Sequence, residues 1–105
     1  MPAAFFTQRR VSGTGWETLH TARGEERIYY VNVANVAEAD VEWSLAINQG
    51  GGNYNSGNAV VMNEEITDHD YDVWGYFVPL FDGATIGVRC SVANGATFTV
   101  YGDRG

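Results

Sequence analysis

The 105-residue sequence contains no lysine, one cysteine and two prolines. All six basic residues are arginines, and thirteen acidic residues give a formal net charge of −7. Nucleic-acid binding depends on clustered basic residues, and the only adjacent basic pair is Arg9-Arg10. The single cysteine, Cys90, excludes an intrachain disulfide and a cysteine-based metal cluster. These absences argue against a nucleic-acid partner and predict folding in a reducing cytoplasm, wherever the protein later works.

Long hydrophobic runs are also missing from the sequence. The longest of them, such as residues 59–62, are a few residues long, whereas a membrane-spanning helix needs about 20 apolar residues. The first ten residues place their charges after a very short apolar stretch, which is the wrong order for a signal peptide. We therefore expect no membrane contact.

What the sequence does contain is a period of two. Residues 40–48 alternate between apolar and polar side chains, as do residues 85–92 and 97–101. Residues 27–34 and 71–78 are rich in aromatic and β-branched side chains, which favour strands. No segment shows the spacing of an amphipathic helix. The sequence predicts an all-β protein, a single jelly-roll-like β-sandwich of about seven to eight antiparallel strands.

Two dipeptides, Asp82-Gly83 and Asn94-Gly95, are strong turn signals because their residues tolerate positive φ. We expect them to join residues 71–78, 85–92 and 97–101 into a meander of three consecutive strands.

The sequence divides into an N-terminal segment and a domain. Residues 1–15 are apolar, then basic, then rich in Ser and Gly, and we expect them to form an extended N-terminal arm outside the sheets. Residues 16–105 form the predicted sandwich domain. Within it, residues 49–58 are rich in Gly and Asn and predict an exposed loop.

An acidic cluster is the densest polar feature of the sequence. Asp68, Asp70 and Asp72 alternate and could supply oxygen ligands to calcium. An EF-hand loop beginning at Asp68 needs glycine and glutamate where the chain has Val73 and Pro79. We interpret the three carboxylates as weak metal candidates in an exposed connection, and predict no metal ion and no cofactor.

No catalytic motif accompanies these residues. His20 and His69 are the only imidazoles, and each is expected to be exposed or carried by a strand. The serines lack a nucleophile-elbow motif. Cys90 alternates with Val88 and Val92 on the expected core face, where a thiol acts as a small apolar group. The sequence predicts a protein without enzymatic activity.

Aromatic side chains offer a further possibility. Tyr54, Trp74 and Tyr76 could stack on sugar rings, with neighbouring asparagines bonding to hydroxyls. The competing interpretation is that such rings fill the core or contacts between subunits. Carbohydrate binding therefore stays open as an alternative of a different class.

Residues 18–102 resemble small β-sandwich proteins in the virions of tailed bacteriophages. The resemblance rests on a Thr-Leu-x-Thr-Ala strand at 18–22, followed by Gly24-Glu25 and a strand that ends in Val-Ala-Asn at 33–35. It rests also on Leu-x-x-Gly-x-x-Ile-x-Val at 80–88. The closing Ser-Val-Ala-Asn-Gly-Ala-Thr-Phe-Thr-Val-Tyr-Gly at 91–102 completes it. Ala84 departs from the family, whose members commonly have Asp there.

The resemblance implies a non-enzymatic virion structural protein, made in the host cytoplasm. We expect a decoration or cement protein on the outer capsid surface, binding the major capsid protein and copies of itself as a homotrimer. The alternatives are a tail or head–tail accessory or fibre module and a carbohydrate-binding adhesion module. Besides the three aromatic residues, the expected partner-binding residues lie in the arm: Phe5, Phe6, Arg9 and Arg10.

Overall fold

The computed structural model describes residues 3–75 and 77–105. These residues form nine β-strands and no helix, so none of them belongs to a helix that could cross a membrane. The all-β prediction is confirmed. In chain order the strands are β1 (Ala3–Arg10), β2 (Glu17–Thr21), β3 (Glu26–Asn35), β4 (Val41–Asn48), β5 (Ala59–Ile66), β6 (Tyr71–Trp74), β7 (Val78–Leu80), β8 (Thr85–Cys90) and β9 (Ala96–Arg104).

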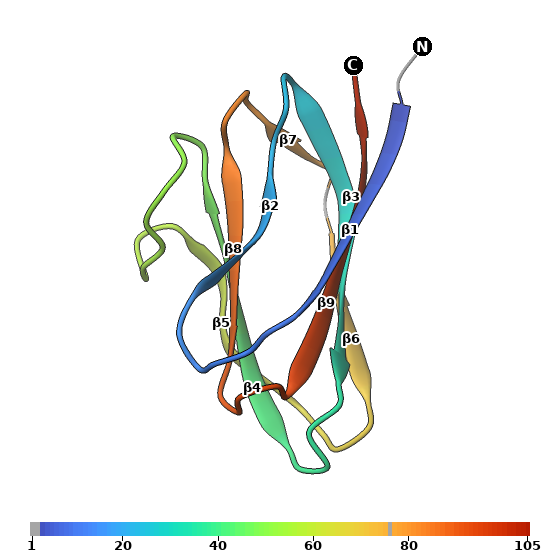
Figure 1. The fold of residues 1–105 in the computed structure, drawn as a ribbon, viewed down its shortest axis with the longest axis vertical. Helices are drawn as coiled ribbons and strands as arrows, with labels where there is room; N and C mark the ends of the chain where they lie inside the picture. Colours follow the sequence, from blue (N-terminus) through green and yellow to red (C-terminus); the bar gives the residue numbers. More distant parts are fainter. Residues whose placement is uncertain (1–2, 76) are drawn as a thin grey trace.

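The strands form two antiparallel sheets packed face to face (Figure 1). One sheet has the order β1-β9-β3-β6, and β7 also pairs with β3; the other has the order β2-β8-β4-β5. β6 and β7 pair with different parts of β3 and act as one interrupted strand. The chain crosses repeatedly between the sheets, as in a jelly roll. The predicted jelly-roll-like sandwich is confirmed.

The predicted meander is wrong. β7 and β9 lie in one sheet and β8 in the other, so both strong turns carry the chain from sheet to sheet. Gly83 and Asn94 do adopt the expected positive φ values of 83° and 57°. A turn dipeptide therefore reverses the chain, but pairing depends on which faces the neighbouring strands bury.

The core lies between the sheets and follows the alternation in the sequence. Trp43 of β4 packs edge-on against Phe98 of β9, with ring centroids 6.2 Å apart, and both are buried. Branched aliphatic side chains such as Ile28, Leu45 and Ile86 surround them. Cys90 is fully buried, as its position on the apolar face predicted.

The expected N-terminal arm is instead largely a strand. β1 pairs with β9 without interruption from Ala3 opposite Arg104 to Arg10 opposite Thr97. The physical reason lies at Gly102, where an added Cβ would lie 2.7 Å from the Phe5 ring. The absent side chain leaves room for Phe5 to pack against the core within its own chain. The prediction that residues 3–10 lie outside the sheets is wrong.

Candidate functional site

The two adjacent phenylalanines predicted to bind a partner point in opposite directions, because successive side chains of a strand alternate between its faces. Phe5 faces inward and stacks on the imidazole of His20, with centroids 4.5 Å apart and planes 7° from parallel. Phe6 faces outward and is 61% exposed. Of this pair, Phe6 alone is largely exposed on the surface.

Arg9 and Arg10 are both engaged by their own chain. Arg9 Nε donates to Glu17 Oε1 at 3.0 Å, and the amides of Ser12 and Gly13 donate to Oε2 of the same carboxylate. Burial acts to raise the pKa of Glu17, but these hydrogen bonds outweigh it and lower the pKa. Arg10 Nε donates to the carbonyl of Asn94 at 2.9 Å. The arginines thus fasten the end of β1 to the domain.

An aromatic row runs across the outer face of the β1-β9-β3-β6 sheet, formed by Phe6, Tyr101 and Tyr30 on three neighbouring strands. The ring centroids are 5.7 Å apart for Phe6 and Tyr101, and 4.7 Å apart for Tyr101 and Tyr30. Tyr30 is 39% exposed. The aromatic row extends to the open edge of the sheet at β1.

A shallow groove of about 590 Å³ adjoins this row. Tyr29, Tyr30 and Asn32 of β3 line one side, and Val73 and Trp74 of β6 line the other. The groove therefore combines aromatic rings with an amide side chain, which can donate and accept hydrogen bonds.

The three aromatic residues predicted to stack on sugars do not form one platform. Trp74 borders the groove described above but packs against the core between the sheets, whereas Tyr54 lies on the outer face of the opposite sheet. Tyr76 lies outside the described residues. An added Cβ on Gly87 would lie 2.5 Å from the Tyr54 ring, and the Tyr54 hydroxyl shares a 2.8 Å hydrogen bond with Thr18. Tyr54 therefore fastens its loop to β2 and β8.

Three side chains, His20, Glu26 and Arg104, join the two sheets near one end of the sandwich, and we call this group the buried clamp. His20 Nε2 of β2 lies 2.6 Å from Oε1 of Glu26 in β3, and Arg104 Nε of β9 donates to Glu26 Oε2 at 2.8 Å. The side chain of Glu26 is completely buried. Burial acts to raise its pKa, but hydrogen bonds from His20, the Arg23 amide and Arg104 outweigh it and lower the pKa.

His20 is carried by a strand, as one of the two expected placements had it, but its side chain is buried and not exposed. A β-bulge between Thr18 and His20 breaks the alternation, so that Leu19 and His20 are both buried. A bulge places an extra residue against one partner and redirects the side chain that follows. The sequence around these residues carries no signal for this bulge.

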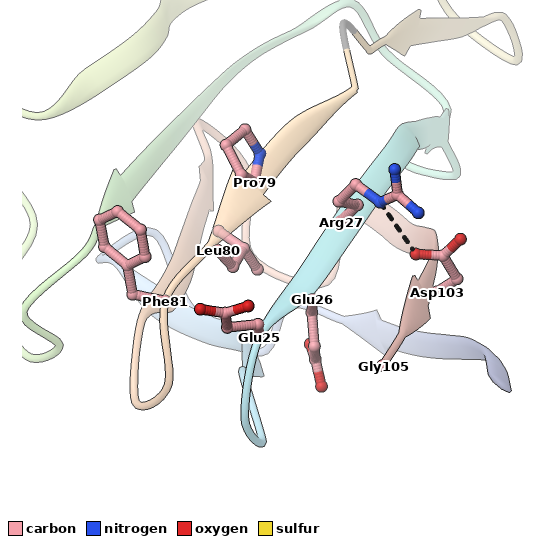
Figure 2. Close-up of a pocket in the computed structure, with 8 residues that line it drawn as sticks. All are labelled: Glu25, Glu26, Arg27, Pro79, Leu80, Phe81, Asp103 and Gly105. Carbon is pink, nitrogen blue, oxygen red and sulfur yellow. Dashed lines mark hydrogen bonds and ion pairs between the residues drawn. The ribbon is translucent and has the colours of Figure 1, made fainter. Parts of the chain in front are cut away.

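A pocket of about 320 Å³ opens beside the buried clamp. Figure 2 shows the side chain of Glu25 directed toward Leu80 and Phe81, and the Arg27–Asp103 pair directed to the other side. Arg27 Nε donates to Asp103 at 3.4 Å. The Tyr29 hydroxyl also donates to Asp103, and this hydrogen bond raises the pKa of the phenol.

Thr7, His20 and Glu26 stand in the order hydroxyl, imidazole, carboxylate found in acyl-transfer triads. Thr7 Oγ1 lies 3.2 Å from His20 Nδ1. The stacked ring of Phe5 covers the imidazole, however, and Glu26 also accepts hydrogen bonds from Arg104 and the Arg23 amide. Both imidazole nitrogens therefore have partners within the chain, and these contacts hold the ring in place, which favours a structural role.

The acidic cluster is spread over a turn and a strand. Asp68 and Asp70 are exposed in the connection between β5 and β6, as predicted, but the prediction is wrong for Asp72, which lies half-buried within β6. Asp68 pairs with His69 at 2.6 Å. Across residues 3–75 and 77–105, no group of three potential ligands is arranged to hold a metal ion.

Comparison with known proteins gives a result for the fold alone. No family model matches the chain, and no curated protein matches its sequence. A chain in the structure of infectious bursal disease virus, Gx strain, superimposes with a TM-score of 0.60 at 10% identity over 97% of this chain. A chain in the crystal structure of the T13 IBDV viral particle gives 0.58 at 9% identity over 97%. The fold of this chain is therefore similar to that of a segment of each of these two chains.

The present chain spans about a third of the length of those chains, 32% and 31% respectively. At 9–10% identity, the likeness shows the fold alone. The narrower likeness to decoration proteins of tailed bacteriophages stays a prediction. At these identities the shared property is the jelly-roll sandwich, and function must be argued from the surface of this chain.

Proposed function

We propose that this chain is a non-enzymatic structural protein of a virion, and specifically a decoration or cement protein on the outer capsid surface of a tailed bacteriophage. The observation that carries the proposal is the aromatic row formed by Phe6, Tyr101 and Tyr30. Exposed aromatic side chains grouped on one sheet are typical of protein contact surfaces. The jelly roll shared with virus-particle chains supports the same role.

The partners in this proposal are the major capsid protein and further copies of the chain, grouped as homotrimers at three-fold positions. Closed symmetry lets one surface serve every copy. The acidic charge of −7 and the absence of lysine argue against a role in contacting the genome. A tail or head–tail accessory or fibre module is the alternative within the same class.

The test is to locate and count the protein in purified particles. Heads and tails are separated, and the protein is quantified in each against the major capsid protein. We expect it in the head fraction, at a fixed ratio to the capsid protein. Presence in tails alone would favour the accessory-module alternative, and absence from particles would contradict a virion role.

The surface can be tested on the same particles. Tyr30→Ser and Tyr101→Ser should weaken rebinding to particles stripped of the protein, because both remove rings from the aromatic row. Val60→Ser is the matched control, since Val60 is 46% exposed on the opposite sheet. Equal rebinding by all three variants would contradict the assignment of this surface.

The groove gives a specific reason to test carbohydrate binding as a second function. Tyr29, Tyr30 and Trp74 line it together with Asn32. Tryptophan fluorescence and NMR titrations with host-surface oligosaccharides measure whether a ligand binds there. Saturable changes in fluorescence or chemical shift that Asn32→Ala abolishes would support an adhesion module. Titrations without any change would contradict carbohydrate binding in the groove.

A further inference from the structure

The outer edge of β1 carries a row of backbone groups that no described strand pairs with. The Val11 amide donates to the carbonyl of Ala96 at 3.1 Å, which continues the β1–β9 register by one pair. Hydrogen-bonded pairs alternate along an antiparallel ladder, so the odd-numbered residues of β1 direct their N–H and C=O groups toward β9. The even-numbered residues direct theirs away from the sheet: Ala4, Phe6, Gln8 and Arg10.

This edge lacks the usual protection against pairing. Proteins guard outer strands with lysine, proline, bulges or short length. β1 is eight residues long, and its pairing with β9 has no register shift. Its two charges lie at one end and are held by Glu17 and the Asn94 carbonyl. Residues 3–8 therefore present an uncharged, regular strand edge.

The other outer strands are guarded. β2 has five residues and a bulge in its pairing with β8. β5 contains Glu64 and Glu65, and its pairing with β4 shifts register twice. β6 has four residues, one of which is Asp72, and β7 has three, one of which is Pro79. Among the strand edges in the described part of the chain, β1 is the one suited to accept a further strand along its whole length.

We propose that β1 pairs antiparallel with the β1 strand of a second copy of this chain, about a two-fold axis at Thr7. In this register Phe6 lies opposite the partner's Gln8, and Ala4 lies opposite the partner's Arg10. All four outward-directed residues of each chain then form hydrogen-bonded pairs. A register centred on Phe6 would set Arg10 opposite residue 2, a proline without an N–H to donate.

The same register is compatible with the side chains. Opposite residues share a face, so the outer faces of the two sheets become continuous. Phe6, 61% exposed in the single chain, is covered by the aliphatic part of the partner's Gln8. The two copies of Arg10 are separated by six residues of strand, about 20 Å, which exceeds the screening length of roughly 8–10 Å in ordinary buffers.

The pairing concerns the isolated protein and does not depend on the proposed virion role. It is a two-fold contact, so a homotrimer on a capsid would use a different surface. If the protein is found in virions but does not pair through β1, the pairing proposal alone is wrong. If it pairs but is absent from virions, the proposed virion role alone is wrong.

Disulfide trapping tests the register. Opposite residues of a non-hydrogen-bonded pair have Cα atoms about 4.5 Å apart, within the range that a disulfide bridges. Thr7→Cys should therefore form a disulfide-linked dimer under mild oxidation. Gln8→Cys is the matched control, because the two Gln8 positions lie on a diagonal about 7–8 Å apart. Cys90 is buried and does not compete. If both variants form disulfide-linked dimers equally well, or if neither forms them, the register centred on Thr7 is wrong.

Light scattering over a range of concentrations tests the contact itself. The unmodified protein should be a dimer at high concentration, and Phe6→Lys should raise the dissociation constant at least tenfold by adding a charge at the edge. Val60→Lys, on the opposite sheet, should leave the constant unchanged. A protein that stays monomeric up to the highest concentration measured, or a dimer insensitive to Phe6→Lys, would contradict the proposal.

Discussion

The imidazole Nε2 of His20 lies 2.6 Å from the carboxylate Oε1 of Glu26, and this contact joins the two sheets of the sandwich from within. His20 belongs to β2 and Glu26 begins β3. The side chains are 6% and 0% exposed, so water does not compete for the contact. Both carboxylate oxygens of Glu26 are used, since Arg104 and the Arg23 amide bond to the second one.

Removal of this carboxylate should be costly. Glu26→Ala leaves His20 and Arg104 without their shared partner, and breaking one side of a buried ion pair typically costs about 3 kcal/mol or more. We expect a loss of that size in the free energy of unfolding, measured by urea denaturation. Glu25→Ala is the control, because Glu25 is adjacent to Glu26 in the sequence and its side chain is exposed. Similar losses in both variants would show that the buried clamp does not stabilise the fold.

Acid should weaken the protein through the same residue. The pKa of Glu26 is held below its ordinary value of 4.5. Its ionised form therefore stabilises the fold above that value, and the contribution is lost as the pH falls through the lowered pKa. The difference in unfolding free energy between the natural protein and Glu26→Gln should be constant near neutral pH and shrink below pH 4.5. For Glu25→Gln, the difference in unfolding free energy from the natural protein should not shrink below pH 4.5.

The strands were predictable from sequence because alternation records which side chains are buried. Val41, Trp43 and Leu45 follow this rule and are buried. Sheet membership was not predictable from the turns, because Asp82-Gly83 specifies a local reversal and not the strand that the next segment pairs with. β1 was missed for a related reason. As an outer strand it buries Phe5 alone against the core, which leaves no alternating pattern to detect.

The candidate surface was predictable only in part. Phe6 was named from its apolar character, and it does lie exposed. Tyr30 and Tyr101 join it through strand pairing between residues far apart in sequence, which composition cannot reveal. The contact between His20 and Glu26 depends on a bulge that the local sequence does not signal.

Tyr54 gives a prediction about the loop of residues 49–58. Gly87→Ala would place a Cβ within 2.5 Å of the Tyr54 ring and displace it. Overpacking of this kind typically costs about 1–3 kcal/mol. We expect faster hydrogen exchange in the loop and a lower unfolding free energy. Gly13→Ala is the control, because an added Cβ there contacts nothing within 4 Å. Unchanged exchange in Gly87→Ala would show that Tyr54 does not fasten the loop.

Calcium should leave the protein unchanged. Asp68 and Asp70 are exposed and make local contacts, with His69 and the Tyr71 amide respectively. A site filled at a hundredfold excess over its dissociation constant would add about 2.7 kcal/mol of stability, and raise the melting temperature by roughly 10 °C or more in a domain of this size. Thermal melts with millimolar calcium and with chelator should coincide. A reversible rise with calcium would identify the acidic cluster as a metal site.

The two adjacent phenylalanines decide whether residues 3–10 behave as a strand or as a free arm. Phe5 stacks on His20 and packs against the core, so Phe5→Ala should lower the unfolding free energy by about 2 kcal/mol, less than a fully buried ring would cost. Phe6 is 61% exposed, so Phe6→Ala should change it by no more than about 0.5 kcal/mol. Both measurements are made at low protein concentration, where pairing between copies does not contribute. A free arm would make the two variants equal and both harmless, whereas a strand in the β1–β9 register makes them differ because neighbouring residues face opposite sides of the sheet.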